Sequence, residues 1–124
     1  MELKLIHEDK RGYIYLVENL LEDNKEFTFM EIKKGFARGG CVHSNKEYFA
    51  VIKGKVKLIL GDKEKNLNAG SSGFLPAGTP HAFIGIEDSI VSEWGITSEE
   101  KKLDKKDTVL RKIVDDTNNS NQNI

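Results

Sequence analysis

The chain is poor in the residues that mark several specialised classes of protein. Its 124 residues include one cysteine, two prolines and one tryptophan, and nineteen basic against twenty acidic residues give a net charge of −1. A single cysteine excludes an intramolecular disulfide and suits a reducing compartment, so we expect a cytoplasmic protein. Without an excess of positive charge, the chain has no long-range field that would attract nucleic acid or an anionic membrane.

Long apolar runs are also missing. Stretches such as Leu58-Ile59-Leu60 are far shorter than the roughly 20 residues that span a bilayer. The segment Met1-Glu2-Leu3-Lys4 lacks the basic and apolar regions of a secretory signal. A hydrophobic fraction of 38% with 31% charged residues is ordinary for a soluble protein, and a chain of this length fits one domain. We therefore expect one globular domain that binds neither nucleic acid nor membrane.

Short segments rich in β-branched and aromatic residues follow one another up to about residue 97. The strands we expect are Tyr13–Val17, Phe27–Ile32, Tyr48–Lys53, Lys55–Leu60, Ala82–Ile86 and Ser89–Trp94. Glu22-Asp23-Asn24 and Gly61-Asp62 are turn signals, and Gly54 predicts a hairpin between its two flanking strands. The pattern over residues 1–97 is typical of an antiparallel sandwich or barrel.

The composition changes after Gly95. Ser98 followed by two glutamates is typical of a helix start, and Leu103, Leu110 and Val114 recur at roughly helical spacing. We expect one or two short helices over residues 98–116, packed outside the barrel. The polar tail 117–124 has nothing to bury, so we predict that it is disordered.

Two spaced motifs hold most of the residues that could carry chemistry. The first reads G-x5-C-x-H-x3-E-x6-G over residues 35–54, and the second reads G-x5-P-x-G-x2-H over residues 70–81. Cys41 and His43 share a strand face, because side chains alternate along a strand, and Glu47 has the same parity. His81 follows a rigid turn with two prolines. These side chains should converge inside the barrel, whereas His7 lies outside both motifs and should be a surface residue.

Two imidazoles and one carboxylate form a donor set suited to a divalent metal. His43, Glu47 and His81 would leave coordination positions open for water or substrate, as in sites for Zn, Fe, Ni or Mn. A thiolate from Cys41 as a fourth ligand would shift the preference towards Zn or Fe. The alternatives are a small buried hydrophobe for Cys41 and a solvated strand edge for Glu47.

The spacing of both motifs resembles that of the cupin superfamily, with Cys41 where the first motif usually has its first histidine. The resemblance implies an all-β fold, the cupin double-stranded β-helix or jelly-roll barrel. It also implies a homodimer, since many small cupins pair through their N-terminal strands.

A narrower resemblance covers Asp9-Lys10-Arg11-Gly12 and Ala37-Arg38-Gly39-Gly40. These segments look like those of the nucleotide-sugar branch, which includes deoxysugar 3,5-epimerases, dTDP-sugar 3,4-ketoisomerases and the C-terminal cupin domain of capsular polysaccharide reductases. The resemblance implies that Arg11 and Arg38 bind substrate phosphates, a role suited to bidentate donors. The alternative is that both are surface charges beside turn glycines.

The chemistry of that branch is proton transfer next to a carbonyl. Cys41 stands at the position of the epimerases' catalytic histidine, which argues against an epimerase, whereas His43 matches the second histidine of the ketoisomerases. We therefore predict a small metal-binding cupin acting on a sugar or sugar nucleotide, with His43 as catalytic residue and Tyr13, Tyr15 or Tyr48 as a partner acid. Two alternatives remain: a binding module without turnover, and a metal-dependent dioxygenase.

Overall fold

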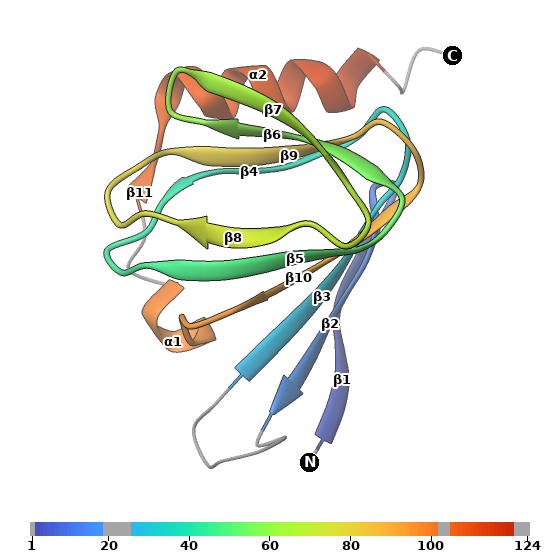
Figure 1. The fold of residues 1–124 in the computed structure, drawn as a ribbon, viewed down its shortest axis with the longest axis vertical. Helices are drawn as coiled ribbons and strands as arrows, with labels where there is room; N and C mark the ends of the chain where they lie inside the picture. Colours follow the sequence, from blue (N-terminus) through green and yellow to red (C-terminus); the bar gives the residue numbers. More distant parts are fainter. Residues whose placement is uncertain (1, 19–25, 102–104, 121–124) are drawn as a thin grey trace.

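The computed structural model describes residues 2–18, 26–101 and 105–120, and in these ranges the chain folds into two antiparallel sheets that face each other (Figure 1). The first sheet has the order β1-β2-β3-β10-β5-β8 and the second has the order β11-β4-β9-β6-β7. The strands are β1 Glu2–Asp9, β2 Gly12–Glu18, β3 Glu26–Ile32, β4 Ala37–Val42, β5 Glu47–Lys53, β6 Lys55–Leu60, β7 Lys63–Asn68, β8 Ser72–Leu75, β9 His81–Gly85, β10 Ser89–Trp94 and β11 Lys105–Lys106. The predicted all-β barrel is confirmed.

The core lies between the sheets and follows from the alternation of each strand. Within β5, for example, Glu47, Phe49 and Val51 are buried, whereas Tyr48 and Ile52 are exposed. Inward side chains from both sheets form one cluster: Met30, Ile32, Phe49, Val51, Val56, Leu58, Leu67, Leu75, Phe83 and Val91. Burial of this apolar surface is the main force that holds the sheets together.

The hairpin predicted around Gly54 is wrong. β5 pairs with β10 and β8 in the first sheet, whereas β6 pairs with β7 and β9 in the second. Gly54 has a φ of +80°, and a Cβ there would collide with Ser89, so the residue forms a tight corner where the chain passes between sheets. The turn predicted at Gly61-Asp62 is confirmed as the β6–β7 hairpin. The turn predicted at residues 22–24 lies outside the described residues.

The C-terminal part contains two helices, as predicted, but the capping residue of the first and the end of the second differ from the prediction. Thr97, not Ser98, caps α1 (Ser98–Lys101): its hydroxyl accepts from the Glu100 N–H, and the Glu100 carboxylate lies 3.2 Å from the same hydroxyl. Asp107 caps α2 (Thr108–Ser120) by accepting from the Leu110 N–H. The predicted position of Leu103 lies outside the described residues.

The helix α2 runs four residues beyond the end predicted at residue 116. Asn118 explains the difference, because its side chain accepts from the N–H of Ala37 at 2.7 Å and donates to the C=O of Ala37 at 3.1 Å. Residues 117–120, predicted to be disordered, are therefore helical, and 121–124 lie outside the described residues. No described helix is long and apolar enough to cross a membrane.

Candidate metal centre

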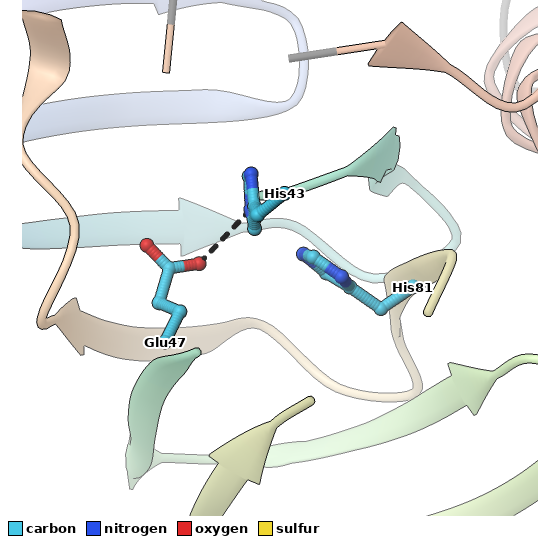
Figure 2. Close-up of side chains that lie close together, drawn as sticks. All are labelled: His43, Glu47 and His81. Atoms are coloured by element: carbon cyan, nitrogen blue, oxygen red, sulfur yellow. Dashed lines mark ion pairs between the residues drawn. The ribbon is translucent and has the colours of Figure 1, made fainter. Parts of the chain in front are cut away.

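Three buried side chains from separate segments of the chain converge inside the barrel, as the motifs predicted. His43 directly follows β4, Glu47 opens β5 and His81 opens β9. One ligand atom from each lies within 4.8 Å of the others, and all three residues are buried. Figure 2 shows the two imidazoles and the carboxylate pointing at a common point. His43 Nε2 lies 3.1 Å from Glu47 Oε1, and the two imidazole centroids are 4.6 Å apart.

The backbone around the site explains why its glycines are needed. Gly39 has a φ of +116°, and a Cβ there would lie 2.7 Å from the carbonyl oxygen of His81. The register between β4 and β9 shifts between Gly39 and Cys41, as at a β-bulge. Gly78, in the turn that precedes His81, donates from its N–H to the His43 C=O at 2.9 Å. The two motifs therefore hold each other directly through the backbone.

The imidazole of His81 is set up to bind as a neutral ligand. Its Nδ1 lies 3.3 Å from the Thr79 carbonyl oxygen, and because a carbonyl only accepts, Nδ1 carries the proton and Nε2 keeps its lone pair. Burial, followed by the nearby His43, lowers the pKa of His81 to about 4. At neutral pH the ring is therefore uncharged and available to a metal.

Glu47 is a completely buried carboxylate. Burial alone would raise its pKa, but the His43 imidazole, whose Nε2 lies 3.1 Å from Glu47 Oε1, and the charge of Lys101 outweigh burial and lower the pKa. The Lys101 ammonium, from α1, lies 3.0 Å from Glu47 Oε2. Glu47 is therefore ionised in the folded protein. The alternative of a solvated strand edge is wrong, because the side chain is fully buried.

Glu93 is a second buried carboxyl group that the sequence analysis missed. It lies on β10, is 7% exposed and is close enough to Glu47 to feel its charge. Burial, and then repulsion by the Glu47 carboxylate, raise the pKa of Glu93 to about 8, so Glu93 is protonated at neutral pH. Its parity with the buried Val91 could have revealed it. Lys101 was also missed, and no spacing signal places it here because it lies beyond both motifs.

Cys41 does not join the other three predicted ligands in the structure. It is half-buried and pairs with His81 across the β4–β9 ladder. Among the described residues, the group with metal-binding geometry contains His43, Glu47 and His81 and no cysteine. The role of Cys41 as a fourth ligand therefore stays a prediction.

The predicted phosphate-binding arginines meet at Asp9, away from the three ligands. Arg11 donates from Nη2 to Asp9 Oδ2 at 2.6 Å, and Arg38 Nη2 lies 3.8 Å from Asp9 Oδ1. Arg38 is 4% exposed and donates from Nε to the Glu31 C=O, and its Nη2 has no hydrogen-bond partner. It is therefore no surface charge, and burial, followed by the charge of Arg11, lowers its pKa to about 10.

The strand register gives the distance between the three candidate metal ligands and the Asp9–Arg11–Arg38 cluster. Glu31, whose carbonyl binds Arg38, pairs with Ile90 of β10. Glu93, which contacts Glu47, lies three residues further along that strand, or about 10 Å. The three tyrosines considered as partner acids lie elsewhere, because Tyr13, Tyr15 and Tyr48 alternate with the inward residues of β2 and β5 and face away from the core.

Two hollows adjoin the ligands. One, of 430 Å³, lies at the barrel mouth beside His43 and is also lined by Ala77, Gly78 and Lys105. The other, of 170 Å³, is mostly apolar and has Glu93 and Lys101 in its wall. The donor set fits a divalent metal, because two imidazoles and an ionised carboxylate are buried together and leave open positions. Zn, Fe, Ni and Mn all remain compatible with it.

Comparisons with solved structures agree with the two-sheet fold. The capsular polysaccharide assembling protein CapF from Staphylococcus aureus superposes with a TM-score of 0.70 at 19% identity, over 86% of this chain and 34% of CapF. Bacillus subtilis oxalate decarboxylase, which has Mn(II) centres, superposes with a TM-score of 0.69 at 19% identity, over 85% of this chain and 30% of that protein. The chain thus spans about a third of the length of either structure.

A search of curated protein sequences finds no match. At these identities the solved structures establish a shared fold and nothing more. The family model of the Cupin domain, however, matches residues 28–94. This range is more than half of the chain and contains both motifs and all three converging ligands. The chain therefore belongs to the cupin domain family.

Proposed function

We propose that the chain is a metal-binding cupin that transfers a proton next to the carbonyl of a sugar or sugar nucleotide. The observation that carries the proposal is the convergence of His43, Glu47 and His81 within 4.8 Å in a buried site. A Zn, Fe, Ni or Mn ion held there would act as a Lewis acid on a substrate oxygen. The similarity in fold to a protein with Mn(II) centres supports manganese among these ions.

His43 has two possible roles, which exclude each other at any one time. As a metal ligand its Nε2 lone pair is used, and the ring cannot accept a proton there. As a general base the ring would accept a proton from the substrate, and the Glu47 carboxylate, whose Oε1 lies 3.1 Å from His43 Nε2, would stabilise the protonated ring. Measurement of metal content and turnover on the same His43→Gln preparation separates the two roles.

Arg11 and Arg38 support a phosphorylated substrate. Arg38 Nη2 is buried without a hydrogen-bond partner beside the Arg11–Asp9 pair, and a phosphate oxygen would satisfy that donor. A separation of about 10 Å along β10 suits a ligand whose sugar lies at the metal centre and whose phosphates lie at the arginines. CapF, a capsular polysaccharide assembling protein, provides a fold-level analogy only.

A binding module without turnover is the second candidate. Lys101 favours it, because the ammonium 3.0 Å from Glu47 already compensates the charge that a metal would compensate. A dioxygenase would be indicated by full iron occupancy with oxygen consumption. Turnover of a sugar nucleotide in the absence of oxygen would exclude both alternatives.

The test of the phosphate-binding role is thermal stabilisation by nucleotides. At a ligand concentration of about 100 times Kd, dTDP or UDP should stabilise the protein by about 2.7 kcal/mol, a rise in Tm of several degrees. Arg38→Lys and Arg11→Gln should lose most of this rise, whereas Lys63→Gln, on exposed β7, should retain it. Uridine, which lacks phosphate, should give no rise. Equal Tm with and without every nucleotide would contradict the proposal.

A further inference from the structure

We propose that Lys101 is an internal counter-cation of the metal centre: its ammonium leaves Glu47 when a divalent metal binds, and α1 then separates from the loop between His43 and Glu47. The inference rests on the proposed metal binding and adds a residue outside both motifs that sets metal affinity. Lys101 ends α1, and its Nζ lies 3.0 Å from Glu47 Oε2. The Glu47 side chain is fully buried, whereas the Lys101 side chain is 28% exposed, so the ammonium can move into water without unfolding the barrel.

The two oxygens of Glu47 face different groups. Figure 2 shows one oxygen directed to His43 and the other directed away from both imidazoles. Oε1 lies 3.1 Å from His43 Nε2, and Oε2 faces Lys101. A metal ion held by Oε1 and an ammonium at Oε2 would therefore be separated by a single carboxylate group. Like charges at that separation repel strongly in a buried site, and one carboxylate cannot compensate the charge of both cations.

The contact between Lys101 and Glu47 is not of the kind that orients a metal ligand. Side chains that orient a ligand do so through a hydrogen bond to it. Among the residues that the structure describes, neither oxygen of Glu47 has a hydrogen-bond partner, so the ammonium stabilises the carboxylate through its charge. A divalent ion supplies the same compensation with a larger charge. The ammonium is therefore a group that a metal replaces, and not a support for the metal.

The helix α1 also contacts the loop between the two ligands at a second point. Asn45, between His43 and Glu47 in the sequence, donates from Nδ2 to Glu100 Oε2 at 2.8 Å in an exposed position. α1 has only four residues, and a single helical turn is not stable by itself in water. The chain just before it is fixed, since Ile96 is 5% exposed. An exposed hydrogen bond contributes little in net terms, so loss of the buried ion pair should separate α1 from the loop.

The counter-cation also gives the metal-free chain a way to fold. A buried carboxylate without a compensating charge is strongly destabilising, and Lys101 supplies that charge in the absence of metal. Coupling between two binding events is reciprocal, so the ammonium weakens metal binding by the same factor as the metal weakens the ion pair. Couplings of this kind typically change an affinity about 5–150-fold. Lys101 therefore lowers metal affinity and stabilises the metal-free protein.

The test is the affinity for Zn²⁺, measured by isothermal titration calorimetry with no other metal present. Lys101→Met and Lys101→Gln, which both remove the charge, should bind Zn²⁺ about 10–100-fold more tightly than the wild type. Lys101→Arg, which keeps the charge, should bind like the wild type. Lys46→Met is the matched control: Lys46 lies in the loop between the ligands, but its ammonium lies 4.2 Å from the Phe74 ring centroid, so its removal should leave the affinity unchanged.

The outcomes separate this inference from the proposed function. Zinc binding by Lys101→Met that is equal to or weaker than that of the wild type would overturn the inference alone. Absence of zinc binding from the wild type and from Lys101→Met would overturn both. Without metal, Lys101→Met should melt several degrees below the wild type, and zinc should raise its Tm by more than that of the wild type. A metal-free Lys101→Met as stable as the wild type would also overturn the inference.

Hydrogen exchange measured by NMR tests the separation of α1 independently. The Lys101 N–H donates to the Thr97 C=O at 3.0 Å, and Zn²⁺, which is diamagnetic, should make this N–H exchange about fivefold faster or more in the wild type. The Arg111 N–H, which donates to the Asp107 C=O at 2.8 Å, should exchange at an unchanged rate. Slower or unchanged exchange at Lys101 in the zinc-loaded protein would overturn the proposed separation of α1.

Discussion

Asp9 is the carboxylate that pairs with the basic side chains of His7, Arg11 and Arg38. It accepts from the backbone N–H of Arg11 at 2.8 Å, from the Arg11 guanidinium and, at 2.7 Å, from His7. The hydrogen bond from the Arg11 side chain is the largest influence on Asp9 and holds its pKa well below the usual value. His7 is exposed, as predicted, and contributes through this pair.

An Asp9→Asn variant should change how stability depends on pH. Because the folded state lowers the pKa of Asp9, its contribution is present above the unfolded pKa of 3.8 and is lost as the pH falls below it. The variant should be less stable by about 0.5–1 kcal/mol at pH 7 and should lose less stability than the wild type between pH 4 and pH 2. Urea unfolding at several pH values measures both effects. Parallel pH curves for the two proteins would contradict this account.

Single residues of the metal centre could be predicted largely because parity and fixed spacing suffice for side chains on adjacent strands. Glu47, His43 and His81 follow from alternation along β5 and from the rigid turn before β9. Glu93 and Lys101 could not be found in this way, because their roles arise from packing between distant segments: β10 lies beside β5 only in the folded sheet, and Lys101 reaches Glu47 from α1.

At the scale of elements, α2 is the part that seals the second sheet. Leu110 is 4% exposed and Val114 is fully buried, whereas Val109 on the other side of the helix is 74% exposed. The Arg111 guanidinium donates to the Gly39 C=O at 2.9 Å, which connects the helix to the strand that carries the first motif. Damage to α2 should therefore reach the metal centre through β4.

Leu110→Ala should destabilise the protein by about 2–5 kcal/mol, the range for a large-to-small change in a core. Val109→Ala, one position away and exposed, should stay within about 0.5 kcal/mol of the wild type. Chemical denaturation of both variants tests the packing of α2. Equal effects of the two substitutions would show that the helix does not pack on the sheet through Leu110.

Strand positions were predictable from alternation, but the connections between strands were not. Gly54 looks like a hairpin turn in sequence because strands flank it closely, yet those strands belong to different sheets. Local turn chemistry does not show whether the chain returns along the same sheet or passes to the other one. The end of α2 was similarly set by a contact remote in sequence, between Asn118 and Ala37. β11 has only two residues, too few for a pattern.

At the scale of the whole molecule, the two sheets have different exteriors and a shared interior. The outer face of the second sheet is sealed by α2 (Figure 1), whereas the outer face of the first sheet keeps apolar side chains such as Tyr48 and Phe74 exposed. The three candidate metal ligands are buried inside the barrel. The two motifs predicted that His43, Glu47 and His81 converge inside the barrel, because the motif spacing includes all three. The exposure of Tyr48 and Phe74 side by side became visible only once the register of β5 and β8 was known.

The central claim is that His43, Glu47 and His81 bind a divalent metal. Its most direct test is elemental analysis of protein purified without an affinity tag and dialysed against Zn, Fe, Ni or Mn. The wild type and His7→Ala, which changes a surface histidine, should each hold about one metal ion per chain. The metal content of His81→Ala should be at least tenfold lower, since even the loss of a residue that only hydrogen-bonds to a metal ligand lowers metal affinity about 10–100-fold. Equal metal content in all three proteins would contradict the account.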